Sequence, residues 1–193
     1  MGHSVQLIIG REPAVGRFLK AWPAARGVAL QGEWVAIPVD EALCDAIGAG
    51  AAGAERDAAF DSSPPGLEAA LAAATAQGGA LAYVETEYFG GQGSQSAGAW
   101  VDGAARGAER GIGAINTALR AIGVVAADGM DAFDTIGLGR RRRMEDYAAP
   151  APVAAPRPAL PRFAPRGTDH VPLWVIALVF FGVIAAGLLV AWY

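Results

Sequence analysis

The chain has 193 residues, with 15 Lys and Arg, 19 Asp and Glu, two His and one Cys. One cysteine excludes a disulfide framework and a cysteine-based zinc cluster, and two histidines near opposite ends of the chain suggest no multi-histidine metal site. Residues 1–138 carry 16 acidic and 8 basic side chains, whereas residues 139–193 carry 3 and 7. Nucleic-acid-binding domains usually present a basic face, so we expect no nucleic-acid partner, and we predict no cofactor and no metal.

The first 143 residues alternate strand and helix signals, and they predict a cytosolic α+β domain with a short mixed or antiparallel sheet and flanking helices. Pro13 suits the first turn of a helix, and Asp40 suits a helix N-cap. The predicted strands cover 4–9, 27–30, 34–39, 81–89 and 95–101. The predicted helices cover 13–22, 40–47, 65–77 and 112–122, with one further short turn within 131–138.

The densest group of polar and aromatic residues is YVETEYFGGQGSQ, at 83–95. In a strand over 81–89, Tyr83, Glu85, Glu87 and Phe89 share one face, with neighbouring side chains about 6.5–7 Å apart. Two carboxylates at that spacing suit an acid–base pair or a divalent cation, so Glu85 and Glu87 are the candidates for catalysis. A solvent-facing strand surface accounts for the same pattern without chemistry, so we assign no catalytic residue.

The three glycines within 90–95 allow positive φ and expose backbone N–H groups, which suits either an anion cradle or a wide hairpin turn. The segment lacks the Lys-Ser/Thr ending of a phosphate-binding loop, and a strand follows it where such a loop needs a helix. We therefore predict a wide hairpin turn. The binding surface expected around it comprises Tyr83, Glu85, Glu87, Tyr88, Phe89, Gly90, Gly91, Gln92, Gly93, Ser94 and Gln95.

Three segments carry a resemblance that spans residues 4–140. The segments YVETEYFGGQGSQ, GAINTALRAIGV and FDTIGLGR resemble a group of bacterial proteins that share an E-Y-F-G-G-x-G-x-Q core. The resemblance implies a domain over that range. It lends no activity and no catalytic residue.

Residues 144–171 form a linker rich in Pro, Ala and Arg. Its six prolines at 150, 152, 156, 158, 161 and 165 exclude helix and sheet, and they predict a polyproline-II spacer over 148–166 that is roughly 60 Å long if fully extended. Four consecutive arginines at 140–143 precede it. They suit either a solvated helix end or loop, or a contact with anionic lipid.

Residues 172–193 are predicted to form a transmembrane helix. Positions 173–193 carry no charged side chain, and 12 of these 21 residues are Leu, Ile, Val or Phe, which favours insertion by about 4–7 kcal/mol. Because Arg157, Arg162 and Arg166 flank it on the N-terminal side, we expect the N-terminal domain in the cytoplasm, with a single pass through the inner membrane. The small residues of the helix suit weak self-association, through Gly182, Ala186, Gly187 and Ala191.

These features predict a tail-anchored bacterial protein whose cytosolic domain binds a protein partner, as a regulatory or immunity-like module. The binding energy is expected from aromatic side chains, with Tyr83, Tyr88 and Phe89 as candidates, while charges steer association. One alternative is a small-molecule-binding or hydrolytic enzyme that uses Glu85, Glu87 and the 90–95 loop. Another is a structural scaffold that oligomerises through its membrane helix.

Overall fold

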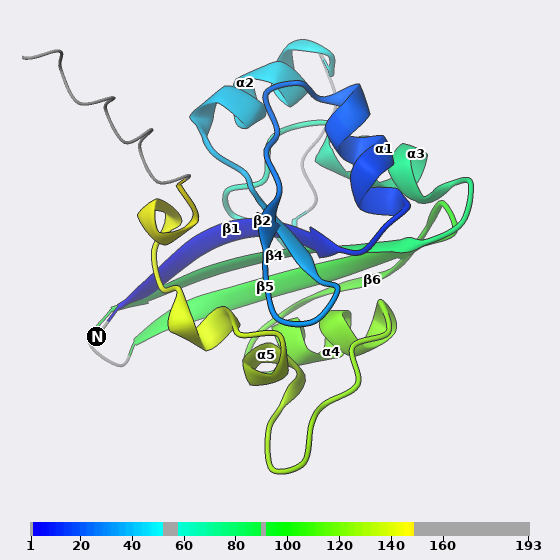
Figure 1. The fold of residues 1–193 in the computed structure, drawn as a ribbon. Helices are drawn as coiled ribbons and strands as arrows, with labels where there is room; N and C mark the ends of the chain where they lie inside the picture. Colours follow the sequence, from blue (N-terminus) through cyan, green and yellow to red (C-terminus); the bar gives the residue numbers. More distant parts are fainter. Residues whose placement is uncertain (1, 52–57, 90–91, 149–193) are drawn as a thin grey trace, which may run out of the picture. The chain divides into compact units, whose positions relative to one another are not determined.

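A computed structural model describes residues 2–51, 58–89 and 92–148, which form an antiparallel six-stranded sheet with helices on both faces (Figure 1). The order across the sheet is β2-β3-β1-β4-β5-β6. The strands are β1 (His3–Gly10), β2 (Val28–Ala29), β3 (Val35–Pro38), β4 (Ala80–Phe89), β5 (Gln92–Val101) and β6 (Ala104–Arg110). The helices are α1 (Ala14–Ala21), α2 (Glu41–Ala49), α3 (Leu67–Thr75), α4 (Ala114–Ala121) and α5 (Ala132–Thr135), with 3-10 turns η1 (Leu138–Arg140) and η2 (Met144–Tyr147). The predicted α+β class is confirmed for this part of the chain.

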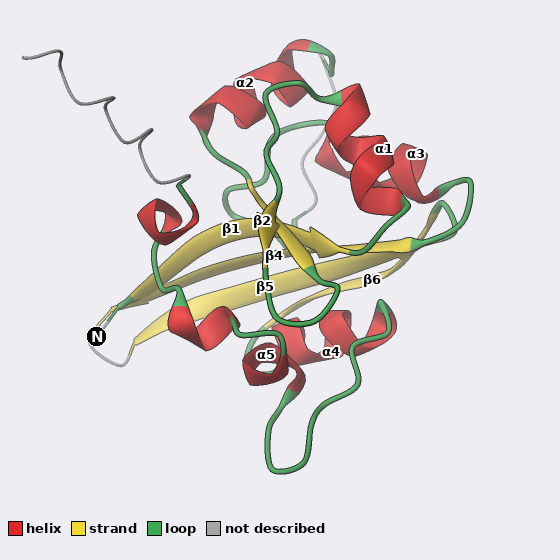
Figure 2. Cartoon of the chain, in the orientation of Figure 1, coloured by secondary structure: helices red, strands yellow, loops and turns green. Residues whose placement is uncertain are grey.

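The centre of the sheet is covered on both faces, by α1, α2 and α3 on one side and by α4 and α5 on the other (Figure 2). In β1 the three successive residues Leu7, Ile8 and Ile9 are all fully buried. Such an uninterrupted apolar run is typical of a strand with helices on both faces. The face under α1–α3 also buries Phe18, Leu71, Tyr83 and Trp100.

Several sequence predictions hold closely in the first half of the chain. The helix α1 lies within the predicted 13–22, and the Asp40 side chain accepts a hydrogen bond from the Leu43 N–H at 3.1 Å, as an N-cap does.

The wide hairpin turn predicted for 90–95 is wrong, because β5 already begins at Gln92. The register pairs Phe89 with Gln92 and Glu87 with Ser94.

The strand β6 was not predicted. Its sequence, AARGAER, has no β-branched or aromatic residue, so local propensity gives no strand signal. The chain reaches this position through a tight turn in which Asp102 and Gly103 both have positive φ, at 51° and 82°. Asp-Gly is a strong hairpin signal, and it brings β6 back alongside β5.

The domain continues past residue 143, where the linker was predicted to begin. Tyr147 is fully buried, its burial raises its pKa to about 12, and the Arg141 guanidinium lies 5.4 Å from the centre of its ring. The predicted start of the linker at 144 is therefore wrong, because η2 belongs to the core. The proline-rich segment and the predicted membrane helix lie outside the described residues. Within the described ranges, no helix is both long and apolar enough to cross a bilayer.

Candidate functional site

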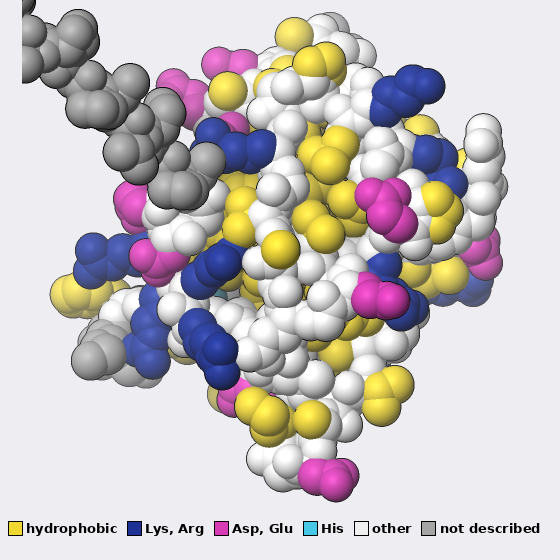
Figure 3. Space-filling view, viewed as in Figure 1, with side chains coloured by type: hydrophobic (Ala, Val, Ile, Leu, Met, Phe, Trp, Pro, Cys, Tyr) yellow, Lys and Arg dark blue, Asp and Glu magenta, His cyan; other side chains and the backbone are white. Residues whose placement is uncertain are grey.

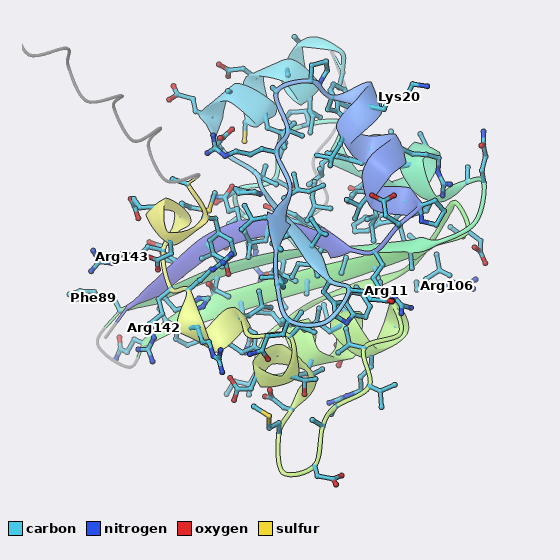
Figure 4. All side chains as sticks on the ribbon, viewed as in Figure 1. Arg11, Lys20, Phe89, Arg106, Arg142 and Arg143 are labelled. Atoms are coloured by element: carbon cyan, nitrogen blue, oxygen red, sulfur yellow. The ribbon has the colours of Figure 1, made fainter. Side chains whose placement is uncertain are left out.

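The predicted site residues of β4 fall into two environments. Tyr83 is fully buried and Glu85 is 7% exposed, whereas Glu87 is exposed and Phe89 is 85% exposed. Figure 4 shows Phe89 pointing away from the domain at the end of the sheet. The four side chains were predicted to be part of one binding surface. This is wrong for Tyr83 and Glu85, because the chain between α2 and α3 covers them.

Tyr83 is a core residue. Its ring packs edge-on against Phe60 with the ring centres 5.0 Å apart, and its hydroxyl donates a hydrogen bond to Glu85 at 3.2 Å. The prediction that Tyr83 contributes to a binding surface is wrong, since a side chain with no exposed area cannot touch a partner. Its polar end is satisfied inside the protein, as buried tyrosines require.

Both carboxylate oxygens of Glu85 hold neighbouring residues. The Asp61 N–H donates to one oxygen at 2.6 Å, and the Ser62 N–H donates to the other at 3.1 Å. Hydrogen bonds to a charged group contribute about 1.5–3 kcal/mol each. Glu85 therefore fixes the backbone at 61–62 over the sheet, and a solvent-facing position for it is excluded.

Arg110 fastens the same loop from the edge strand. Its guanidinium donates to the Asp61 carboxylate at 2.6 Å and to the Ala59 carbonyl at 3.2 Å. The hydrogen bond with Asp61 is the largest cause of a raised Arg110 pKa. The sheet register places Gln6, Glu85, Ser96 and Arg110 in one row across β1, β4, β5 and β6.

On the same face of the sheet, the next row toward the hairpin end consists of Ser4, Glu87 and Ser94, one residue from each of three neighbouring strands. A shallow hollow of about 50 Å³ lies over the two rows, lined by Ser4, Gln6, Asp61, Ser62, Glu85, Thr86, Glu87 and Ser94. Glu87 is an exposed part of this lining, whereas the Glu85 carboxylate is buried and accepts hydrogen bonds from the loop. The two glutamates are therefore chemically unequal. Within the described residues, no three His, Cys, Asp or Glu side chains are grouped so as to hold a metal ion.

A larger hollow, of about 410 Å³, lies at the hairpin end of the sheet. Its lining comprises Gly2, His3, Ser4, Glu87, Tyr88, Phe89, Arg143, Met144 and Glu145. His3 is a half-buried member of this lining, with Nδ1 2.6 Å from the Thr86 hydroxyl and the centre of its ring 5.6 Å from that of Phe133. Burial, and to a lesser degree the nearby Arg142 charge, lower the pKa of His3. This hollow combines an exposed aromatic rim with charges of both signs.

The structure brings Tyr88, Phe89, Glu87 and Ser94 to this end, together with residues that sequence reasoning did not single out. Asp61, Ser62 and Arg110 gave no signal, because their contacts join segments more than twenty residues apart. Of the remaining predicted positions, Gln92, Gly93 and Gln95 lie in β5. Gly90, Gly91, Arg157, Arg162, Arg166, Gly182, Ala186, Gly187 and Ala191 lie outside the described residues.

No protein-family model, no curated protein and no solved structure matches the chain. A functional assignment therefore has to come from the arrangement of its own residues.

Proposed function

We propose that this is a tail-anchored, single-pass protein of the bacterial inner membrane whose cytosolic domain binds a protein partner. The apolar segment at 173–193 and the arginines at its N-terminal flank support the anchor and its orientation. The hairpin end of the domain supports the binding role, which suits a regulatory or immunity-like module.

The observation that carries the binding role is the exposure of Phe89, at 85%, on the rim of the 410 Å³ hollow. Burying a phenylalanine side chain contributes about 1.5–3 kcal/mol. Aromatic side chains beside a concave surface are the residues that usually dominate the binding energy of an interface. Tyr88, which is half-buried beside it, extends the same apolar area, and Glu87 supplies a charge that orients a partner.

The arrangement around Glu85 favours binding over an acid–base enzyme. A general base needs an oxygen within reach of a substrate proton, whereas Glu85 is only 7% exposed and each of its carboxylate oxygens lies against a backbone N–H of the loop. Glu87 has no second accessible carboxylate in its own row, where its neighbours are the serines Ser4 and Ser94.

The test is photo-crosslinking of the full-length protein in bacterial membranes, with benzoylphenylalanine in place of Phe89. The matched control carries it in place of Ile112, which is 97% exposed and precedes α4. We expect a crosslinked protein at position 89 and not at position 112, identified by mass spectrometry. Phe89→Ala should then weaken affinity for that protein about tenfold or more, while Ile112→Ala should not.

Three results would contradict the proposal. The first is crosslinking to the same proteins from both positions, and the second is crosslinking from position 89 to lipid alone. The third is a Glu87→Gln variant that no longer binds the crosslinked protein while Phe89→Ala still binds it. A crosslink at 89 to a second copy of the chain would favour the scaffold.

A further inference from the structure

The arginine run at 140–143 is held against the domain by its backbone. The Ser4 N–H donates to the Arg142 carbonyl at 2.8 Å, and Ser4 and Arg143 form an isolated parallel bridge. The N–H groups of Arg142 and Arg143 donate to the Asp146 carboxylate at 2.7 and 3.1 Å, and these bonds lower the Asp146 pKa. The positions of Arg142 and Arg143 are thus fixed relative to the sheet, although both residues are exposed.

The arginines of this segment differ in what they do. Arg141 is half-buried and lies over the Tyr147 ring, so it supports the core. Arg142 and Arg143 project at the end of the sheet that also carries Phe89 (Figure 4). Figure 3 shows several basic side chains on this side of the domain, with an exposed hydrophobic side chain beside them.

The charge of the rest of the domain makes this end distinctive. Residues 1–138 carry twice as many acidic as basic side chains, 16 against 8. An anionic surface repels such a body, and it attracts the segment in which four arginines follow one another. Glu87 and Glu145 line the same hollow as Arg143, and Asp146 accepts hydrogen bonds from the N–H groups of Arg142 and Arg143.

The arginine run also lies close in the chain to the predicted membrane anchor. Only a few residues after Arg143, the chain continues into the proline-rich segment with three further arginines, and then into the apolar run at 173–193. A membrane anchor there would tether the domain to a bilayer through residues 149–172, which span about 75 Å if they are fully extended as polyproline II. Surface charges attract lipid headgroups only within about a Debye length, some 8–10 Å, so a docked domain is distinct from a merely tethered one.

We propose that Arg142 and Arg143 dock the domain on anionic lipid headgroups, with the hairpin end of the sheet toward the bilayer. The inference rests on the proposed membrane anchor and goes beyond it, because it fixes which end of the domain meets the membrane. Phe89 then lies at the level of the lipid headgroups, and it contacts the part of the partner that lies closest to the membrane surface.

The experiment uses the full-length protein in nanodiscs of phosphatidylcholine, with or without phosphatidylglycerol. A donor dye is placed at the exposed Gln92 as Gln92→Cys, with Cys44→Ala to remove the only native thiol, and an acceptor dye is carried by lipid headgroups. We expect stronger energy transfer on anionic discs than on neutral discs. Arg142→Gln with Arg143→Gln should lower the ratio of docked to undocked protein by about 25-fold, about fivefold for each arginine.

The matched control is the pair Arg106→Gln and Arg120→Gln, two exposed arginines on β6 and α4 that change the net charge equally. This pair should leave the energy transfer on anionic discs unchanged. Equal transfer on both lipids, or an equal loss in the control pair, would overturn docking and leave the anchor intact. A transfer that depends on an added protein and not on phosphatidylglycerol would also overturn it. Failure of the full-length chain to enter the discs would overturn the anchor, and docking with it.

Discussion

The two halves of β4 have the same alternating pattern and opposite roles. Tyr83 and Glu85 lie under the loop at 59–62, where the Tyr83 ring packs on Phe60 and the Glu85 carboxylate accepts hydrogen bonds from Tyr83 and from the loop backbone. Glu87 and Phe89, two and four positions beyond Glu85 on the same strand, lie beyond the loop and remain exposed. Alternation shows which side chains share a face, but a segment elsewhere in the chain decides how far along the strand that face is covered. The covered half stabilises the domain, and the uncovered half is available to a partner.

The comparison predicts the largest loss of stability at Tyr83. Tyr83→Ala removes a fully buried ring and its contact with Phe60, so we expect a loss of about 3–5 kcal/mol in the free energy of unfolding. Tyr83→Phe removes only the hydroxyl that donates to the Glu85 carboxylate and should cost about 1.5–3 kcal/mol. Denaturant unfolding of the full-length protein, followed by circular dichroism, measures both. A Tyr83→Ala variant as stable as the parent would contradict the role of Tyr83 as a buried core residue.

Glu85 and Glu87 form a matched pair for the same comparison. Glu85→Gln removes the charge and turns an NH2 group toward backbone N–H donors, so a loss of about 2–3 kcal/mol is expected. Glu87→Gln lies on the exposed half and should change the free energy of unfolding by less than about 0.5 kcal/mol. Unfolding midpoints at one pH measure the difference. Equal losses of stability in Glu85→Gln and Glu87→Gln would show that the loop does not stabilise the covered half of β4 through Glu85.

His3 predicts a smaller, pH-dependent effect. Its pKa is below the usual value of 6.5 in the folded protein, because of burial and the Arg142 charge. The unfolded chain therefore takes up the proton first, so the stability contribution is complete above about pH 6.5 and is lost as pH falls through the folded pKa. The pKa of Asp146 is lowered from 3.8, so protonation of its carboxylate reduces the stability of the folded protein only at a more acidic pH.

Thermal midpoints between pH 8 and 5 test the His3 effect. We expect the parent to lose stability toward pH 5 and His3→Gln to lose less over the same interval. A slope that is unchanged in His3→Gln would assign the pH dependence to other groups.

Sequence reasoning reaches the elements whose determinants are local. The Asp40 cap and the helix after Pro13 follow from a few neighbouring residues. The role of Glu85 does not, because it depends on donors at Asp61 and Ser62, more than twenty residues earlier in the chain.

The end of the domain was misjudged for a related reason. Met144 and Tyr147 stand among charged residues next to a proline-rich stretch, which is typical of a linker. They pack on the domain because the backbone at Arg142 and Arg143 runs beside β1. The burial of Tyr147 holds this segment on the domain, although the charged residues around it are typical of a linker.

The most direct test of the division of β4 measures stability and partner affinity on the same variants, Glu85→Gln and Phe89→Ala, using the protein that crosslinks at position 89. Glu85→Gln should lower the unfolding midpoint while its folded fraction binds with the parent affinity. Phe89→Ala should keep the parent midpoint and bind at least about tenfold more weakly. A folded Glu85→Gln variant without binding, beside a Phe89→Ala variant with full affinity, would contradict this account and return the site to Glu85.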